Sequence, residues 1–204
     1  MRKFYCLFLA VFLAVAGAEA LLPEPLPQPR TSGGEGIFTL LEKRASGTRD
    51  AFPTGAVSDQ ELATILWAAT GRNRNGSGWT VPVGMGRPPH VKVYVVKNDG
   101  AFIYDWQKHA LGELTKKNIK AEVTQDDFVK NSAVILVFVA DTAANKRAEM
   151  DNILVGAMSQ NVYLAADALG IKTRYLMTLK ADGIRRELKL NKTDVPLCIM
   201  PLGK

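Results

Sequence analysis

The stretch SAVILVFVAD, residues 132–141, decides the fold of this chain. Between Ser132 and Asp141 every residue is apolar. A strand with one solvent-facing side alternates apolar and polar residues, whereas a strand covered on both faces is continuously apolar. We therefore expect a central β-strand here, with other structure packed on both of its sides.

Further strands are predicted on both sides of this run in the sequence. VKVYVV (91–96) and AFIYDW (101–106) are joined across Asn98-Asp99-Gly100, which has the turn chemistry of a β-hairpin. After the run, TRYLMTL (173–179) and PLCIMPLG (196–203) also have the composition of strands. The predicted sheet is therefore mostly antiparallel.

Two helices are signalled clearly. Residues 58–71, SDQELATILWAATG, begin with Ser58 and Glu61 as a capping box and end at Gly71. A longer helix is predicted from about 147 to 169, and it is apolar over most of its circumference. Such a helix must be buried in a core or against another chain. Shorter helices or helical turns are predicted at 37–44, 109–114, 124–131 and 182–190.

Because helices and strands are mixed and at least one hairpin is present, we predict an α+β fold rather than a doubly wound sheet. It has three layers, with a mostly antiparallel central sheet flanked by helices, and it occupies residues 37–204.

The N-terminus has a different character. Residues 1–20 combine Arg2 and Lys3, an apolar run and small-residue cleavage options, which is the pattern of a secretory signal peptide; an uncleaved membrane anchor is the alternative. A signal peptide implies a periplasmic or secreted protein that meets the membrane only during export. Residues 21–36 are rich in Pro, Gly and Ser and are expected to form an extended arm, either wrapped on a partner subunit or disordered.

Composition excludes several functional classes. The net charge of +6 is spread along the chain, without the dense basic stripe typical of nucleic-acid binding, and suits a small phosphorylated ligand or nothing specific. His90 and His109 are too few and too isolated for a metal site. Cys198 is expected to be a buried core thiol. The sequence lacks H-E-x-x-H, C-x-x-C and G-x-S-x-G, so the protein either binds a ligand or takes its chemistry from a cofactor.

One short segment carries candidate binding residues. In EKRASGTRDAF, residues 42–52, Arg44 and Arg49 flank a cluster that contains Ser46. Arginine forks and a hydroxyl group suit a phosphate dianion. A solvated basic turn after a helix C-terminus has the same composition, and the residues alone leave both interpretations open.

Several segments in order resemble the nitroreductase superfamily: KRASGTRDAF, the stretch 58–96, SAVILVFVAD, MSQNVYLAADALGIKT and the terminal CIMPLG. The similarity covers about residues 37–203 and is greatest to the thiazoline and oxazoline dehydrogenases of the SagB/ThcOx type. It implies an FMN-dependent oxidoreductase that exchanges hydride with a small substrate at flavin N5, without a catalytic side chain or a metal. It also implies a homodimer with one FMN at each end of its interface.

The resemblance assigns the binding residues. Arg44, Ser46 and Arg49 match an R-x-S-x-R-like element that grips the flavin phosphate, with one extra residue before the second arginine. Gln160 and Asn161 match the helix at the centre of the dimer. A loop that matches the segment along the isoalloxazine ring contains Asn73, Arg74, Thr80, Val81, Pro82, Val83 and Gly84.

Two positions depart from the family pattern. The family usually has Pro-Ser or Pro-Thr where this chain has Pro82-Val83, and a glycine that faces flavin N5 where it has Leu176-Met177. These departures favour an alternative function, a non-catalytic dimeric ligand-binding protein on the same fold. The retained Arg44, Ser46 and Arg49 favour the enzyme.

Overall fold

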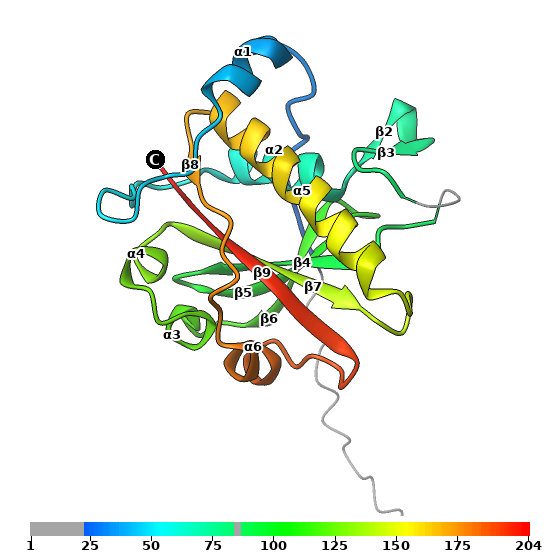
Figure 1. The fold of residues 1–204 in the computed structure, drawn as a ribbon, viewed down its shortest axis with the longest axis vertical. Helices are drawn as coiled ribbons and strands as arrows, with labels where there is room; N and C mark the ends of the chain where they lie inside the picture. The colour runs from blue at the N-terminus through cyan, green and yellow to red at the C-terminus, as the bar shows by residue number, and fades with distance from the viewer. Residues whose placement is uncertain (1–22, 84–86) are drawn as a thin grey trace, which may run out of the picture.

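A seven-stranded sheet forms the centre of the molecule in the computed structural model, which describes residues 23–83 and 87–204 (Figure 1). The predicted signal peptide and Gly84 lie outside the described residues. Neighbouring strands in the order β1-β6-β5-β4-β7-β9-β8 all pair antiparallel. The strands are β1 (Glu24–Pro25), β4 (Val91–Lys97), β5 (Gly100–Asp105), β6 (Ala110–Thr115), β7 (Val134–Asp141), β8 (Lys172–Thr173) and β9 (Asp194–Gly203).

The apolar run at 132–141 forms β7, between β4 and β9. Its residues from Val134 to Ala140 are at most 2% exposed, which confirms the predicted central strand. Leu136 and Phe138 belong to the core on one face of the sheet, whereas Ile135 and Val137 belong to the core on the other. The continuous apolar run therefore contributes side chains to the hydrophobic cores on both faces of the sheet.

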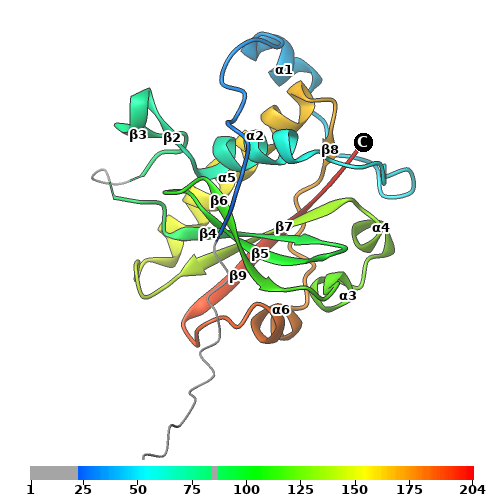
Figure 2. The same ribbon diagram turned by 180° about the vertical axis from the view of Figure 1, so that it is seen from behind.

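Helices cover both faces and make three layers (Figures 1 and 2). One core includes residues of α2 (Asp59–Thr70) and α5 (Ala148–Ala168), and α1 packs beside α5. The other core includes residues of the short helices α3, α4 and α6. The predicted α+β class with a mainly antiparallel sheet is confirmed. The remaining helices are α1 (Ile37–Lys43), α3 (Lys120–Val123), α4 (Asp127–Lys130) and α6 (Ala181–Glu187).

The predicted capping box at the start of α2 is present. The backbone N–H of Glu61 donates to the Ser58 side chain, and the Glu61 carboxylate accepts from the Ser58 N–H at 2.9 Å. Two backbone donors that the first turn would leave unpaired are thereby satisfied. The α2 helix ends at Gly71, as predicted, and a separate two-stranded ribbon of β2 (Arg72–Asn73) and β3 (Gly78–Trp79) follows it.

Two local predictions are wrong. Residues 109–114 were expected to be a helical turn, but β6 occupies Ala110–Thr115, because pairing with β5 and burial of Leu111 override a weak local preference. TRYLMTL was expected to be a full strand, but β8 is limited to Lys172–Thr173 and a single bridge from Leu176 to Ile199. This segment lies at the sheet edge, where Met177 is 72% exposed.

The arm is ordered against its own protomer where it is described. β1 pairs with β6, and the Leu26 N–H donates to the His109 carbonyl at 3.0 Å. The Arg30 N–H donates to Thr64 Oγ1 of α2 at 3.0 Å. The arm therefore runs from the sheet edge across α2 to α1. Across the described residues, the structure contains no helix with the length and apolar character needed to cross a membrane.

Candidate functional site

Tyr163 of α5 brings Arg44 and Ser46 together. Arg44 follows the last turn of α1, and its guanidinium carbon lies 5.1 Å from the centroid of the Tyr163 ring. The Ser46 and Tyr163 hydroxyl oxygens are 2.8 Å apart. The Tyr163 ring is buried, so these contacts fix the start of the 44–49 segment on the helix layer.

Arg49 has different neighbours from Arg44. Its Nη2 lies 3.1 Å from Asp126 Oδ2, and its guanidinium carbon lies 5.3 Å from the centroid of the Phe128 ring in α4. The Arg49 side chain is still 51% exposed. The two arginines of the predicted phosphate element therefore differ, because Arg49 has a carboxylate partner and Arg44 has none within ion-pairing distance among the described residues.

Arg174 also belongs to this group, although its sequence context predicted no role for it in binding. Arg174 Nη1 donates to the Gly47 carbonyl at 3.0 Å, and the Gly47 N–H donates to the Thr173 carbonyl at 2.9 Å. The described residues place no carboxylate within ion-pairing distance of Arg174. The available signal was a basic residue directly after the phrase ALGIKT, but it was assigned to a strand.

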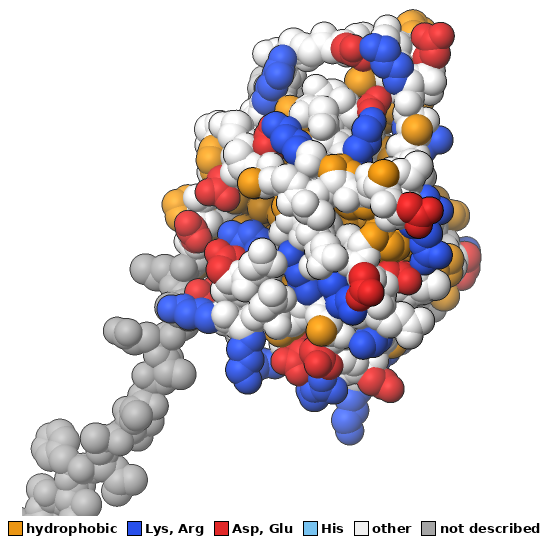
Figure 3. Space-filling view, turned by 90° about the vertical axis from the view of Figure 1, so that its left-hand side faces the viewer, with side chains coloured by type: hydrophobic (Ala, Val, Ile, Leu, Met, Phe, Trp, Pro, Cys, Tyr) orange, Lys and Arg blue, Asp and Glu red, His pale blue; other side chains and the backbone are white. Residues whose placement is uncertain are grey.

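Gly47 is required by the close packing of this segment. A Cβ at Gly47 would lie 2.7 Å from the Phe52 ring, so a larger residue would displace the segment that carries Ser46. The face turned toward the viewer in Figure 3 carries Lys and Arg side chains together with Asp, Glu and hydrophobic ones. Two arginines without carboxylate partners beside a hydroxyl group fit the phosphate of a flavin nucleotide.

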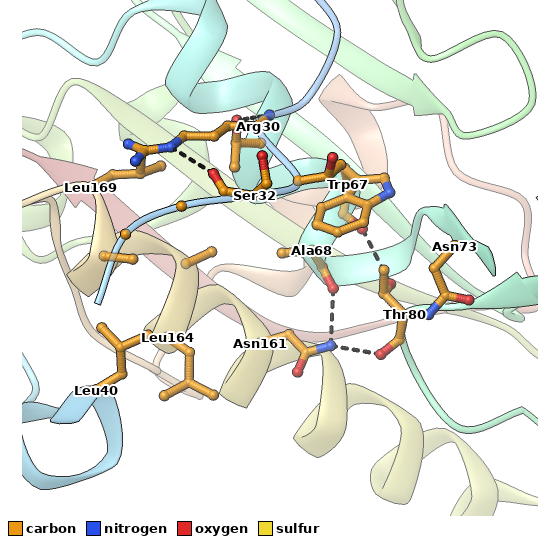
Figure 4. Close-up of a pocket in the computed structure, with 16 residues that line it drawn as sticks. Arg30, Ser32, Leu40, Trp67, Ala68, Asn73, Thr80, Asn161, Leu164 and Leu169 are labelled. Carbon is orange, nitrogen blue, oxygen red and sulfur yellow. Dashed lines mark hydrogen bonds between the residues drawn. The ribbon is translucent and has the colours of Figure 1, made fainter. Parts of the chain in front are cut away.

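Asn161 of α5 fixes the second predicted set of residues. Its Nδ2 donates to the carbonyls of Ala68, at 3.0 Å, and Thr80, at 2.9 Å (Figure 4). The Thr80 hydroxyl in turn lies 3.1 Å from the Trp67 carbonyl. The predicted amide of Asn161 therefore has partners within its own chain and ties α2, α5 and the loop after β3 together.

Asn73 lines three cavities, and two of them include other residues of the predicted ring set. One, of about 370 Å³, also contacts Asn161, Thr80 and the apolar side of α5 (Figure 4). The other, of about 540 Å³, is lined by residues 73–74 and 77–83, which include Pro82 and Val83. Asn73 Oδ1 is buried and accepts no hydrogen bond within the part of the chain that the structure describes. A bound group with an N–H donor, such as a flavin ring, would satisfy it.

The two predicted sets of residues lie at opposite sides of the protomer. The 44–49 segment leads into the loop at the left of Figure 1, whereas β2, β3 and the loop after them are at the right, and Figure 2 shows the same separation from behind. Within one protomer, Arg44 therefore lies near Ser46, and Asn73 lies near Pro82. The first pair and the second pair are far from each other.

Comparisons with known proteins agree on one family. The sequence model of the nitroreductase family matches residues 41–204. A protein named as a nitroreductase from Methanocaldococcus jannaschii is 27% identical over 161 residues, covering 71% of this chain and 80% of that protein.

Solved structures share the fold. A protein described as a nitroreductase from Ralstonia eutropha is 27% identical, with a TM-score of 0.79, over 90% of this chain and 94% of its own. The E. coli microcin synthetase McbBCD complex has a chain with a TM-score of 0.68 and 18% identity, covering 97% of this chain and 84% of that one. At that identity the second likeness concerns the fold alone.

Proposed function

This chain belongs to the nitroreductase family of oxidoreductases, and from that premise we propose that it is an FMN-dependent oxidoreductase acting on a small substrate. The observation that carries the proposal is the cluster of Arg44, Ser46 and Arg174 around Tyr163 and Gly47, in which neither arginine has a carboxylate partner among the described residues. Guanidinium groups without such partners are suited to a ligand that carries its own negative charge.

The phosphate of FMN would be held by Arg44, Ser46 and Arg174. Arg49 would contribute if its exposed ion pair with Asp126 opens, which costs little at the surface. The loop with Asn73, Arg74, Pro82 and Val83 would line the ring, with Asn73 Oδ1 as an acceptor. Bound FMN supplies hydride exchange at its N5 atom. The chain's own role is then to orient the cofactor and limit access of water.

We further propose that the functional unit is a homodimer. α1 exposes Ile37, Phe38 and Leu41, with Phe38 86% exposed, and α5 exposes Ile153 at 62%. A helix surface this apolar is typical of a protein interface. Since the phosphate set and the ring set lie at opposite sides of one protomer (Figures 1 and 2), one FMN would contact the first set of one copy and the second set of its partner.

Complementation between two variants tests the shared site. Arg44→Ala and Asn73→Ala should each weaken FMN binding, and a mixed dimer of the two should contain one site with neither substitution. Co-expressed variants should therefore recover saturable flavin fluorescence quenching that neither variant has alone. Binding by the mixture equal to the average of the two variants would refute the shared site.

Sedimentation tests the dimer itself. Phe38→Glu should shift the protein from dimer to monomer, because it places a charge in the apolar surface of α1. Val195→Glu is the matched control, since Val195 is an exposed apolar residue of β9 and not part of the apolar surface of α1. A wild-type protein that sediments as a monomer at micromolar concentration would overturn the proposal.

Export and the SagB/ThcOx branch are further parts of the proposal. Export rests on the composition of residues 1–20 and predicts a mature protein that starts after residue 20, which the intact mass of secreted or periplasmic protein measures. If the protein is exported, we expect an electron partner other than a soluble nicotinamide.

The alternative function is a dimeric ligand-binding protein without redox activity, which is favoured by Val83 and by the exposed Met177. It predicts no substrate-dependent reoxidation of reduced flavin, whether or not the protein binds FMN.

A further inference from the structure

The arm, the β2–β3 ribbon and the turn between β5 and β6 line an open cavity of about 630 Å³. Its walls combine two arginines with aromatic rings, and the arm closes one side through residues 28, 29 and 31. The side chains that define it are Trp67, Arg72, Arg74, Tyr104, Trp106 and His109. A volume of this size is within the range of about 300–1,000 Å³ that small-molecule sites occupy.

The Arg72 guanidinium group is positioned by stacking on aromatic rings rather than by an ion pair with a carboxylate. Its guanidinium carbon lies 4.6 Å from the centroid of the Trp79 ring and 5.2 Å from that of Trp106. The two indole rings meet edge to face with their centroids 4.6 Å apart. Arg72 Nη1 donates to the Gly76 carbonyl, and within the described chain no carboxylate pairs with this guanidinium. Its plane is therefore fixed, while other N–H donors stay available to a ligand.

Arg74 adds a second positive charge to the same cavity. A Cβ at Gly78 would lie 1.9 Å from Arg74 Nη2, so the glycine allows this side chain to lie against the backbone of β3. Neither Asp nor Glu is among the residues that line the cavity, and the described residues include no ion pair for Arg74. Two guanidinium groups in a cavity without acids favour an anionic ligand.

The opposite wall is neutral and fixed by hydrogen bonds. His109 Nε2 lies 2.9 Å from the Pro27 carbonyl, which can only accept, so Nε2 carries the proton. His109 Nδ1 then accepts from the Tyr104 hydroxyl at 2.8 Å. These two hydrogen bonds connect β5 to the arm at this side of the cavity. Because the imidazole is neutral, Arg72 and Arg74 are the charged side chains that line the cavity.

We propose that this cavity binds a small planar aromatic carboxylate. The carboxylate lies against the guanidinium groups of Arg72 and Arg74, where a fork can donate two parallel hydrogen bonds. The aromatic ring packs against Trp67 and Trp106, whose faces and edges accommodate another planar ring. Arg72 is not among the residues assigned to FMN, whereas Asn73 and Arg74 line both this cavity and the one assigned to the flavin ring, so this ligand occupies a site adjacent to the flavin site.

The intrinsic fluorescence of the protein reports on this cavity. The chain has three tryptophans: Trp67 and Trp106 line the cavity, and Trp79 packs on Trp106. We would titrate the full chain with benzoate, with benzamide as the neutral analogue and with inorganic phosphate as an anion without a ring. The inference predicts a saturable change in tryptophan emission with benzoate, and binding of the other two at least about tenfold weaker.

Substitutions locate the site. Arg72→Met keeps an unbranched side chain against the indoles but removes the charge, and should weaken benzoate binding by about tenfold or more. Arg185→Met, which removes an arginine of α6, is the control and should bind like the wild type. An unchanged affinity in Arg72→Met, equal binding of benzamide and benzoate, or no saturable signal up to millimolar benzoate would each overturn the inference.

Repeating the titration with saturating FMN separates this inference from the proposed function. Retained benzoate affinity would support a separate site, whereas competition would refute it and assign the cavity to flavin binding. If the chain bound no FMN, the tryptophan signal and the effect of Arg72→Met would still decide the inference.

Discussion

The hydroxyl oxygens of Ser46 and Tyr163 lie 2.8 Å apart, although 117 positions separate the two residues in the sequence. The Tyr163 oxygen also accepts a hydrogen bond from the Tyr175 N–H at 2.8 Å. One side chain of α5 therefore joins the segment that carries Arg44 to the segment that carries Arg174. This relationship explains how a proposed phosphate site is assembled from two loops that have little regular structure of their own.

Tyr163→Phe should destabilise the protein by about 1–3 kcal/mol, because the Tyr175 N–H loses its acceptor in a partly buried position. Urea denaturation measures the effect. Ser46→Ala is the matched control, since it removes one of the two hydrogen bonds and leaves the Tyr175 N–H satisfied; it should cost about 1 kcal/mol or less. Equal costs for the two substitutions would contradict the role assigned to Tyr163.

Cys198 should be chemically inert in the folded protein. It is fully buried, and burial raises the pKa of its thiol to about 12. Since the thiolate is the reactive form, Ellman's reagent at about pH 8 should modify a Cys6→Ser variant only as fast as the protein unfolds. Rapid modification in denaturant is the control. Rapid stoichiometric modification of the native protein would contradict the buried-core assignment.

Lys120 should stabilise the fold through its ammonium group. The residue is buried, and its Nζ donates to Asn98 Oδ1 at 2.8 Å and to the carbonyls of Ser132 and Ala133. Lys120→Met would leave these acceptors without a donor, at a cost of about 1–3 kcal/mol. Lys117→Met, at an exposed position nearby, should change the free energy of unfolding little. Equal effects of the two variants in urea denaturation would refute this assignment.

Acid should weaken the attachment of the arm through His109. Burial lowers the pKa of His109 below its ordinary value of 6.5, so the folded state holds the neutral ring. Its contribution is complete above that value and is lost as the pH falls through the lower folded pKa, because the unfolded chain takes up the proton first. The groups around it are Tyr104, its hydrogen-bond partner, and Arg72 and Arg74, which line the same cavity.

His109→Asn tests this dependence. Asn tolerates the positive φ of 48° at this position but does not titrate. Between about pH 7 and pH 5, the wild type should lose more stability to urea than the variant does. Parallel curves for the two proteins across this interval would contradict the assignment of the pH effect to His109.

The sequence predicts best those structural features that depend on neighbouring residues alone. The apolar run of β7, the capping box of α2 and the Asn98-Asp99-Gly100 hairpin each depend on neighbouring residues, and all three are confirmed. The segment 109–114 was mispredicted because pairing with β5 outweighs its local preference. The same limit applies to β8, because its pairing with Leu202 and Gly203 of β9 is a tertiary contact that local composition does not report.

The candidate site depends more on tertiary structure. Arg44, Ser46 and Arg49 lie within six residues of one another in the sequence. That spacing does not predict the pairing of Arg49 with Asp126, which is 77 positions away. Arg174 belongs to the candidate site only because its side chain donates a hydrogen bond to the Gly47 carbonyl. The separation of the 44–49 segment from the β2–β3 ribbon also appears only in three dimensions (Figure 2).

Titration of the purified protein with FMN, followed by quenching of flavin fluorescence, tests the central claim most directly. We expect saturable binding at micromolar FMN and an affinity about 10- to 150-fold lower in Arg44→Ala, as for loss of a hydrogen bond to a charged group. Arg49→Ala, whose arginine is already paired with Asp126, should lose less. The absence of saturable binding at micromolar FMN, with the protein folded, would contradict the account.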